Sequence, residues 1–202
     1  MDEKNYLSPV YCKKMKWGKQ DIINFLKENH GKADILNLTE LVKTENIATK
    51  DVYSICKNEK EQQVVFRAAW LLEEIFMNIE DSFTIILKDF LLHYPLQQNQ
   101  SAQRHYSKIA MRISNVAYIK RYQLSAAQLK PLTEGSFDWL IFEDTPVAIK
   151  CNCIDILYNL SLVLANEKWI IDELLNILEL NLLSESPALL SRTKRVLKKL
   201  KL

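Results

Sequence analysis

The amino-acid sequence predicts an all-α fold, an α-α superhelix built from helical hairpins. The 202 residues include only three glycines and five prolines, well below the roughly 12% that these two residues reach together in an average chain. Tight β-hairpins and phosphate-binding loops need glycine where φ is positive or where the backbone approaches a ligand. Apolar residues recur at helical spacing along nearly the whole chain, and one helical pattern returns at intervals of about forty residues.

The apolar periodicity gives the expected helices in chain order. They are residues 20–29, 33–43, 50–56, 60–78, 81–94, 101–121, 125–132, 136–142, 147–164, 167–183 and 187–200. Segment 147–164 is apolar nearly all round, which is typical of a helix sandwiched between neighbours. The last segment turns lysines and arginines outward, so we expect it to be a polar capping helix.

Hydroxyl–proline pairs mark three expected helix starts. A Ser or Thr at the N-cap accepts a hydrogen bond from an otherwise unpaired backbone N–H. Proline at the first helical position neither loses a needed donor nor strains φ. The three pairs are Ser8-Pro9, Thr145-Pro146 and Ser186-Pro187.

A basic residue followed by apolar residues four or five positions later recurs on four of these helices, at Arg67, Arg104, Lys150 and Arg192. Successive members of this set are 37, 46 and 42 residues apart. A second amphipathic helix follows each of the first three. A helix pair that recurs at roughly 40–47 residues is typical of HEAT and armadillo repeats.

The sequence VVFRAAWLLEEI at residues 64–75 resembles the first helix of a HEAT repeat, and residues 145–200 resemble two further units at the end of an array. The resemblance covers about residues 60–202 and, more loosely, residues 1–59. It implies a single α-solenoid domain over residues 1–202, with divergent helices over 1–59 and HEAT-like helix pairs over 60–202. Because solenoids present extended concave surfaces, a non-catalytic scaffold that binds a protein partner on its concave surface is the expected function.

Two alternatives come from further resemblances. HEAT-like proteins include DNA alkylation repair glycosylases, which use basic and aromatic residues on a concave surface, so DNA binding of the alkylation-repair type is the first alternative. The chain is also similar to small bacterial HEAT-like proteins sometimes labelled adenylosuccinate lyase, which would imply a small-molecule lyase. Lyases of that superfamily share a glycine- and serine-rich loop ending in Met-Pro-x-Lys-x-Asn, and this sequence has no match to it.

The charge balance differs from that of a dedicated nucleic-acid binder, since 27 basic residues face 25 acidic ones, for a net charge of +2. One local feature points the other way. Arg104, Lys108 and Arg112 lie four apart on one helix face and are followed by Lys120 and Arg121, and such a stripe can follow a phosphate backbone. We interpret it as the solvated face of an amphipathic helix and expect a protein partner rather than nucleic acid.

The sequence assigns no catalytic residue, metal ligand or cofactor, and it leaves the binding residues unknown. Cys151 and Cys153 form a Cys-x-Cys pair inside a helical segment, where residues two apart point about 200° away from each other. One metal ion therefore cannot readily take both thiols. We expect the cysteines to be small buried hydrophobes in a reduced compartment. The residues with chemically active side chains are the cysteines Cys12, Cys56, Cys151 and Cys153, the histidines His30, His93 and His105, and the carboxylate pairs 73–74, 80–81 and 143–144. The carboxylate pairs are expected at exposed helix positions or helix ends.

Each tryptophan lies in or beside an apolar helix face, so we expect a core position for Trp17, Trp70, Trp139 and Trp169. Trp139, flanked by Asp138 and close to Gly135, is the one most open to exposure. Residues 1–18 are polar and lysine-rich, unlike a signal peptide. The most apolar stretch, residues 157–165, is far shorter than the roughly 20 residues that cross a membrane. A cytoplasmic protein without membrane association is therefore expected.

Overall fold

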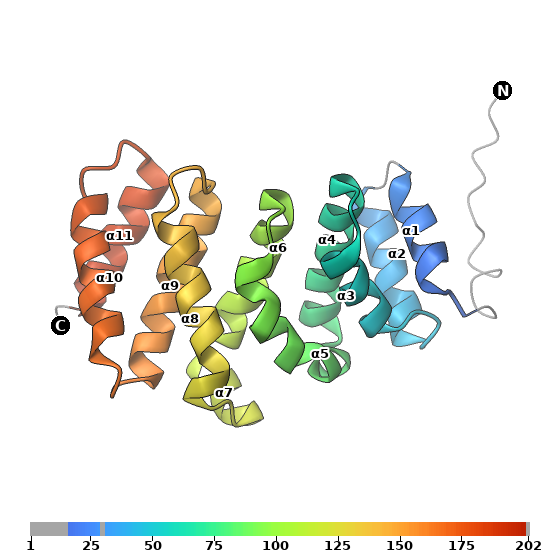
Figure 1. Cartoon of the computed structure of the whole chain (residues 1–202), viewed down its shortest axis with the longest axis horizontal. Coiled ribbons are helices and arrows are strands. Elements are labelled where there is room, and N and C mark those ends of the chain that lie inside the picture. Colours follow the sequence, from blue (N-terminus) through green and yellow to red (C-terminus); the bar gives the residue numbers. More distant parts are fainter. Residues whose placement is uncertain (1–15, 29–30, 201–202) are drawn as a thin grey trace. The chain divides into compact units, whose positions relative to one another are not determined.

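The computed structural model describes residues 16–28 and 31–200. Within these ranges it contains eleven α-helices, one 3-10 helix and no strand, so the all-α prediction is confirmed (Figure 1). The helices are α1 (Lys19–Lys27), α2 (Lys32–Lys43), α3 (Thr49–Asn58), α4 (Gln62–Asn78), α5 (Glu80–His93), η1 (Tyr94–Leu96), α6 (Gln100–Ile113), α7 (Val116–Tyr122), α8 (Ala126–Ile141), α9 (Val147–Val163), α10 (Lys168–Asn181) and α11 (Pro187–Leu200).

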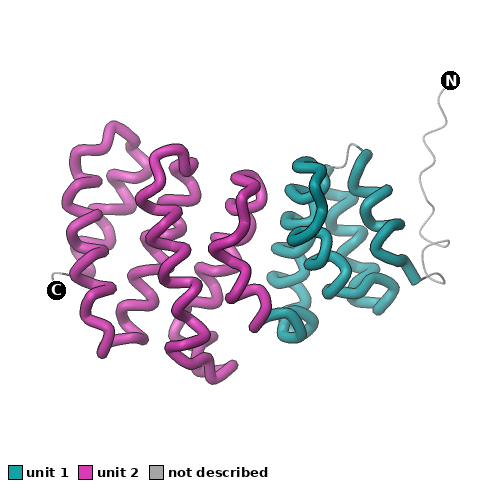
Figure 2. The backbone as a smooth tube through the Cα atoms, viewed as in Figure 1, with its two compact units in different colours: residues 1–87 teal, residues 88–202 magenta. Residues whose placement is uncertain are grey.

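The chain divides into two compact units, residues 1–87 and 88–202 (Figure 2). In the first unit α4 packs against α1, α2 and α3. The apolar face of α4 is fully buried and consists of Val64, Ala68, Ala69, Leu71, Leu72 and Ile75. Burial of so broad a face stabilises the unit, since each Å² of apolar surface removed from water contributes roughly 25 cal/mol.

In the second unit α9 is central, which confirms that segment 147–164 is sandwiched between neighbours. It packs against α6 and α11 and also against α8 and α10. We call α6, α9 and α11 the first layer. The second layer consists of α8, α10 and the short η1 turn, which packs against α8. Within this unit the helices follow one another in chain order (Figure 1).

Two matched hydrogen bonds join α6 to α9 within the first layer. Asn152 Nδ2 donates to Ser107 Oγ at 2.9 Å, and Asn159 Nδ2 donates to Ser114 Oγ at 3.1 Å. Both bonds join residues 45 apart in sequence. The partners on each helix are two turns apart, so the two helices run in register. This separation agrees with the period of roughly 40–47 residues expected of HEAT repeats.

Three of the four recurring basic residues form a hydrogen bond or ion pair with an element that precedes them in the chain. The Arg67 guanidinium donates to the carbonyl of Leu26 at 2.6 Å, in the last turn of α1, where backbone carbonyls have no helical partner. The Lys150 ammonium donates to the carbonyl of Glu143, just beyond α8, at 3.1 Å. Arg192 pairs with Asp155 on α9. The side chain of Arg104, the fourth member, is exposed.

Two expected elements differ in the structure. Segment 101–121 is broken into α6 and α7, because the Asn115 side chain accepts a hydrogen bond from the backbone N–H of Ala117 at 2.9 Å and starts a new helix. Segments 125–132 and 136–142 are one helix, α8, which runs through both Pro131 and Gly135. Packing against α9 and η1 overrides the local cost of these two residues.

The expected helix starts have different outcomes. Pro187 opens α11, and Ser186 Oγ accepts a hydrogen bond from the N–H of Leu189 at 3.4 Å, as predicted. The Thr145-Pro146 prediction is wrong by one residue, since Pro146 occupies the N-cap of α9 and makes no side-chain cap there. The Ser8-Pro9 pair lies outside the described residues. The other helix ends lie within two residues of their expected positions.

Candidate functional site

The histidines and carboxylates do not form a metal centre in the part of the chain that the structure describes, where no group of three or more His, Cys, Asp or Glu is placed to hold an ion. His93 Nδ1 lies 3.1 Å from Asp89 Oδ1, the single pair that the sequence spacing indicated. His105 is buried, and His30 lies outside the described residues. One expectation about carboxylates is wrong, because Glu73 is buried on α4 rather than exposed.

The described cysteines are buried free thiols, as expected for Cys56, Cys151 and Cys153, while Cys12 lies outside the described residues. Burial raises the pKa of the Cys153 thiol to about 12 and also raises the pKa of Cys151. Cys153 is hydrogen-bonded to the hydroxyl of Tyr94, whose own pKa burial raises well above its ordinary value. A neutral buried thiol is a poor nucleophile and a poor metal ligand, so the burial of Cys151 and Cys153 disfavours both roles for them.

Charge is divided between the two layers of the second unit. Helices α6, α9 and α11 carry nine Lys and Arg residues and one carboxylate, Asp155. Helices α8 and α10 carry two lysines and five carboxylates. The stripe of Arg104, Lys108 and Arg112 was predicted from the sequence, and of these residues the first and last are exposed and the middle one is half-buried. The division of charge between the layers was not predicted, because it becomes visible only when the helices are assigned to layers.

The basic first layer is partly neutralised from within. Asp155 on α9 accepts from Arg192 and, at 2.6 Å, from Arg195, both on α11. The Lys199 ammonium lies 5.1 Å from the ring centroid of Tyr158, at cation–π distance. Three of the five α11 cations therefore have partners on α9, whereas Arg104 and Arg112 of the α6 stripe are exposed.

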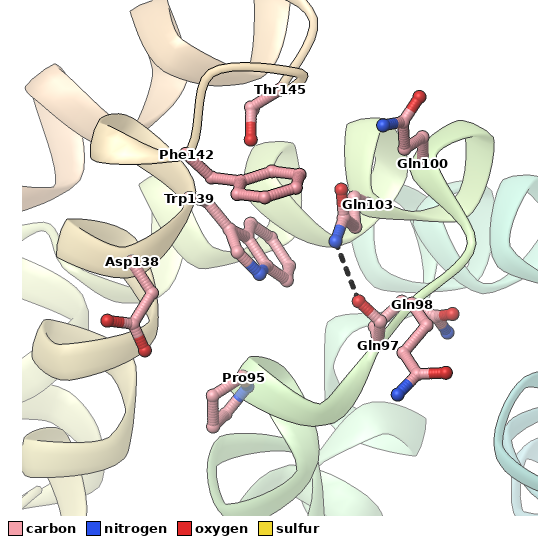
Figure 3. A pocket seen from close by; sticks show the side chains of 9 residues that line it. All are labelled: Pro95, Gln97, Gln98, Gln100, Gln103, Asp138, Trp139, Phe142 and Thr145. Carbon is pink, nitrogen blue, oxygen red and sulfur yellow. Dashed lines mark hydrogen bonds between the residues drawn. The ribbon is translucent and has the colours of Figure 1, made fainter.

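A cleft of about 320 Å³ lies where the two layers meet, between the η1–α6 segment and the end of α8. We call it the glutamine cleft. Figure 3 shows the Trp139 and Phe142 rings side by side on the α8 wall, with Gln97 and Gln103 across from them. Its lining residues are Pro95, Gln97, Gln98, Gln100, Gln103, Asp138, Trp139, Phe142 and Thr145.

Hydrogen bonds fix the glutamine wall. Gln103 Nε2 donates to the carbonyl of Gln97 at 2.7 Å, the bond drawn in Figure 3. Gln100 Nε2 donates to the carbonyl of Asp144 at 3.1 Å, which ties the start of α6 to the loop after α8. Asn99 caps α6 by accepting from the N–H of Ala102 at 2.9 Å. The cleft is therefore built before any ligand arrives, which lowers the entropic cost of binding.

A second cleft, of about 420 Å³, lies between the first half of α8 and the start of α10. We call it the tryptophan cleft. Trp169 is 46% exposed and forms part of its wall. The Trp169 ring contacts Phe137 of α8 with 5.6 Å between ring centroids. The lining residues are Ala126, Ala127, Lys130, Thr133, Glu134, Leu164, Glu167, Trp169 and Ile170.

Of the four tryptophans expected in the core, Trp139 alone is buried, and Trp17 and Trp70 are half-buried. Trp139 is buried, with 5% of its surface exposed, although its ring borders the glutamine cleft. Trp169 was expected in the core, and that prediction is wrong. It follows Lys168 at the first turn of α10, where only Ile170, Leu174 and Leu178 face inward. Helical periodicity places Trp169 at the edge of this buried face, and the sequence alone could not show that no helix covers it.

Exposed apolar side chains lie in the lining of the glutamine cleft or next to lining residues in the sequence. Phe142 is 57% exposed, and its neighbour Ile141 is 61% exposed. Leu96, which follows Pro95 of the cleft wall, is 65% exposed. Single exposed hydrophobes are ordinary on protein surfaces, but an exposed aromatic ring in the wall of a cleft is typical of an interaction site.

Residues 22–200 match the model of the HEAT repeat domain, and the chain belongs to this family. The recurring basic residues and the 45-residue separation of the α6–α9 hydrogen bonds therefore reflect a true repeat. No curated protein and no solved structure shows a significant match to the chain. Among residues 16–28 and 31–200, no helix combines the length and the hydropathy needed to cross a lipid bilayer.

Proposed function

We propose that this protein is a non-catalytic helical-repeat scaffold that binds a protein partner, and that the partner lies on the second layer of residues 88–202. The glutamine cleft carries this proposal. It combines a prebuilt wall of amides with an aromatic wall from the buried Trp139 and the exposed Phe142. Buried aromatic anchors surrounded by polar groups are the usual centres of binding energy at protein interfaces.

The chemistry of the lining favours binding over catalysis. Amide, indole, phenyl and hydroxyl groups neither gain nor lose a proton near neutral pH, and Asp138 is the one titratable group that lines the glutamine cleft. General acid–base chemistry needs a positioned titratable group, usually with a partner that adjusts its pKa. A cytoplasmic location is part of this proposal, supported by three free buried thiols, which suit a reducing compartment.

A second candidate function is binding of nucleic acid on the first layer, which the excess of nine cations over one carboxylate favours. The pairing of Arg192 and Arg195 with Asp155 weakens it, since those charges already have a counterion within the protein. The acidic second layer would also repel a phosphate backbone that extended beyond the basic face.

Quantitative affinity co-purification from the native cell tests the proposal. The bait would be the wild-type chain, a second-layer variant carrying Phe142→Asp and Trp169→Asp, and a matched first-layer variant carrying Arg104→Glu and Arg112→Glu. All four positions are exposed, so each variant should keep the wild-type far-UV circular dichroism spectrum. We expect a nuclease-resistant protein partner that falls at least tenfold in the second-layer variant, or about 1.4 kcal/mol, and stays in the first-layer variant.

The proposal fails if every co-purified protein survives the second-layer changes. It also fails if the captured material disappears with nuclease and with the first-layer changes, because that result assigns the binding face to nucleic acid.

A further inference from the structure

We propose that the partner reaches the second layer with an extended segment rich in lysine and arginine, and that one cationic side chain of this segment binds in the tryptophan cleft. This inference rests on the proposed function, because it names the chemistry of the partner on that same surface. It is carried by the geometry of Trp169, Glu167 and Glu134 and by the charge of the layer around them.

The tryptophan cleft has the parts of a cation site. The indole N–H of Trp169 donates to Glu167 Oε2 at 3.0 Å, which holds the ring and the carboxylate together. Almost half of the Trp169 surface is exposed, so a cation can reach it. Glu134, on the α8 side, supplies a second carboxylate. Cations are attracted to the face of an indole, and tryptophan is the strongest of the aromatic residues in this respect.

The net charge of the cleft fits one positive group. Lys130 lies 3.7 Å from Glu134 and offsets one of the two carboxylates. That leaves one uncompensated negative charge, which a single lysine or arginine side chain would balance. Arginine fits the site better than lysine, since its planar guanidinium can lie on the indole and hydrogen-bond to a carboxylate at the same time. The cleft volume of about 420 Å³ leaves ample room for such a side chain.

The two clefts are linked along one face of α8. Glu134 lines the tryptophan cleft and Asp138 lines the glutamine cleft. They are four residues apart on the helix, which is about 6 Å along its axis. An extended chain covers that distance in about two residues, and residues two apart in an extended chain point to the same side. The partner segment would therefore place a cation at Glu134 and a second cation, or an apolar residue for Trp139 and Phe142, two positions away.

Charge beyond the clefts favours the same occupant. Asp172 and Glu173 are exposed one turn after Trp169 on α10, and Glu143 and Asp144 are exposed in the loop after α8. With Lys130 and Lys168 as the lysines on the two helices, the layer carries a net negative charge. An acidic or phosphorylated segment would be repelled here, whereas a basic one would be attracted.

Selection from a displayed library of random peptides tests the inference with the full-length chain. Peptides of about twelve residues extend to at most about 40 Å, enough to cross both clefts. We expect the enriched peptides to carry at least two Lys or Arg residues and few acidic ones. A synthetic copy of the most enriched peptide should bind at least tenfold more weakly to a Glu134→Lys, Glu167→Lys variant. It should bind unchanged to the control variant Arg104→Glu, Arg112→Glu on the first layer.

Two further arms separate charge from structural damage. Trp169→Leu keeps an apolar side chain at the position but removes the indole, and it should weaken the basic peptide several-fold. A charge-swapped peptide, with Glu in place of each Lys and Arg, should bind the Glu134→Lys, Glu167→Lys variant better than it binds the wild-type chain. This rescue would show that the double variant is folded and that charge sets the preference.

The outcomes distinguish this inference from the function it rests on. Enriched peptides that are acidic or neutral, yet lose binding with Phe142→Asp, would overturn the basic-segment inference and leave the scaffold proposal in place. Enriched peptides that bind both second-layer variants as tightly as the wild-type chain would overturn both the basic-segment inference and the scaffold proposal. If the wild-type chain forms a dimer that the Glu134→Lys, Glu167→Lys variant abolishes, the occupant is a second copy of this chain, and the inference is wrong.

Discussion

Gly135 of α8 packs against Pro95 of η1 so closely that a Cβ atom on the glycine would lie 2.7 Å from the Pro95 Cβ and 3.0 Å from its Cα. Real Cβ atoms do not approach other carbons to such a distance, so this glycine is required by the contact between two second-layer elements. The same contact sets the η1 wall of the glutamine cleft, of which Pro95 is a part.

Gly135→Ala should therefore destabilise the protein. Alanine is the better helix former by about 1 kcal/mol, but the overpacking of a rigid neighbour costs about 1–3 kcal/mol. Because the close atoms include the backbone Cα of Pro95, we expect a net loss of about 1 kcal/mol or more in urea unfolding. Gly31→Ala is the control, since a Cβ there meets nothing within 4 Å. A Gly135→Ala variant more stable than wild type would contradict the close packing.

Leu157→Asp should unfold residues 88–202. Leu157 lies on α9, the first-layer helix against which α8 and α10 of the second layer also pack, and none of its surface is exposed. An unpaired carboxylate buried there costs several kcal/mol, a large part of the stability of a whole domain, which is about 5–15 kcal/mol. Circular dichroism and limited proteolysis would show the loss. Leu180→Asp on α10, where the leucine is 70% exposed, should change stability little. A Leu157→Asp variant that melts like wild type would refute the central place of α9.

Stability should fall with rising pH above about 9. Burial raises the Cys153 pKa from an ordinary value near 9 to about 12, so between these values the folded protein holds a proton that the unfolded chain releases. The stabilisation is complete below the unfolded pKa and is lost as the pH rises toward the folded one, by up to about 1.4 kcal/mol per pH unit. Urea unfolding at several pH values would show a shallower decline for Cys153→Ala. Equal slopes would contradict the buried neutral thiol.

Duplex DNA should bind weakly. Non-specific affinity comes from neutralised phosphates and released counterions, so it needs uncompensated cations. Asp155 already engages Arg192 and Arg195, and the basic cluster to be tested on α6 consists of Arg104, Lys108 and Arg112. An anisotropy titration with a labelled duplex of about 20 base pairs at about 0.15 M salt should give no sub-micromolar binding. Sub-micromolar affinity that disappears when these three residues become glutamate would favour the nucleic-acid alternative.

The fold was largely accessible from the sequence because helix-forming signals are local. Apolar periodicity and the recurring basic residues located the helices and the repeat, and segment 147–164 was correctly predicted to lie between neighbouring helices. The errors occurred where tertiary contacts outweigh local signals. Packing carries α8 through Pro131 and Gly135, and the Asn115 cap splits a segment whose periodicity looked continuous.

The candidate site was far less accessible. The glutamine cleft joins residues 95–103 with residues 138–145, and only the packing of η1 against α8 brings them together. Trp169 is exposed because neighbouring elements leave that part of α10 uncovered, and no local sequence pattern encodes this. The separation of charge between the layers needs the layer assignment of every helix. The local stripe of Arg104, Lys108 and Arg112 was visible in the sequence because its spacing lies within one helix.

Site-specific photo-cross-linking in the native cell is the most direct test of a protein partner on the second layer. Benzoylphenylalanine would replace Ile141, which is 61% exposed beside Phe142, and in a matched sample Lys194, which is exposed on α11 of the first layer. We predict a discrete, nuclease-resistant protein adduct from position 141 that is absent or at least tenfold weaker from position 194. Adducts from position 194 alone, or adducts that nuclease removes, would contradict binding of a protein partner at the second layer.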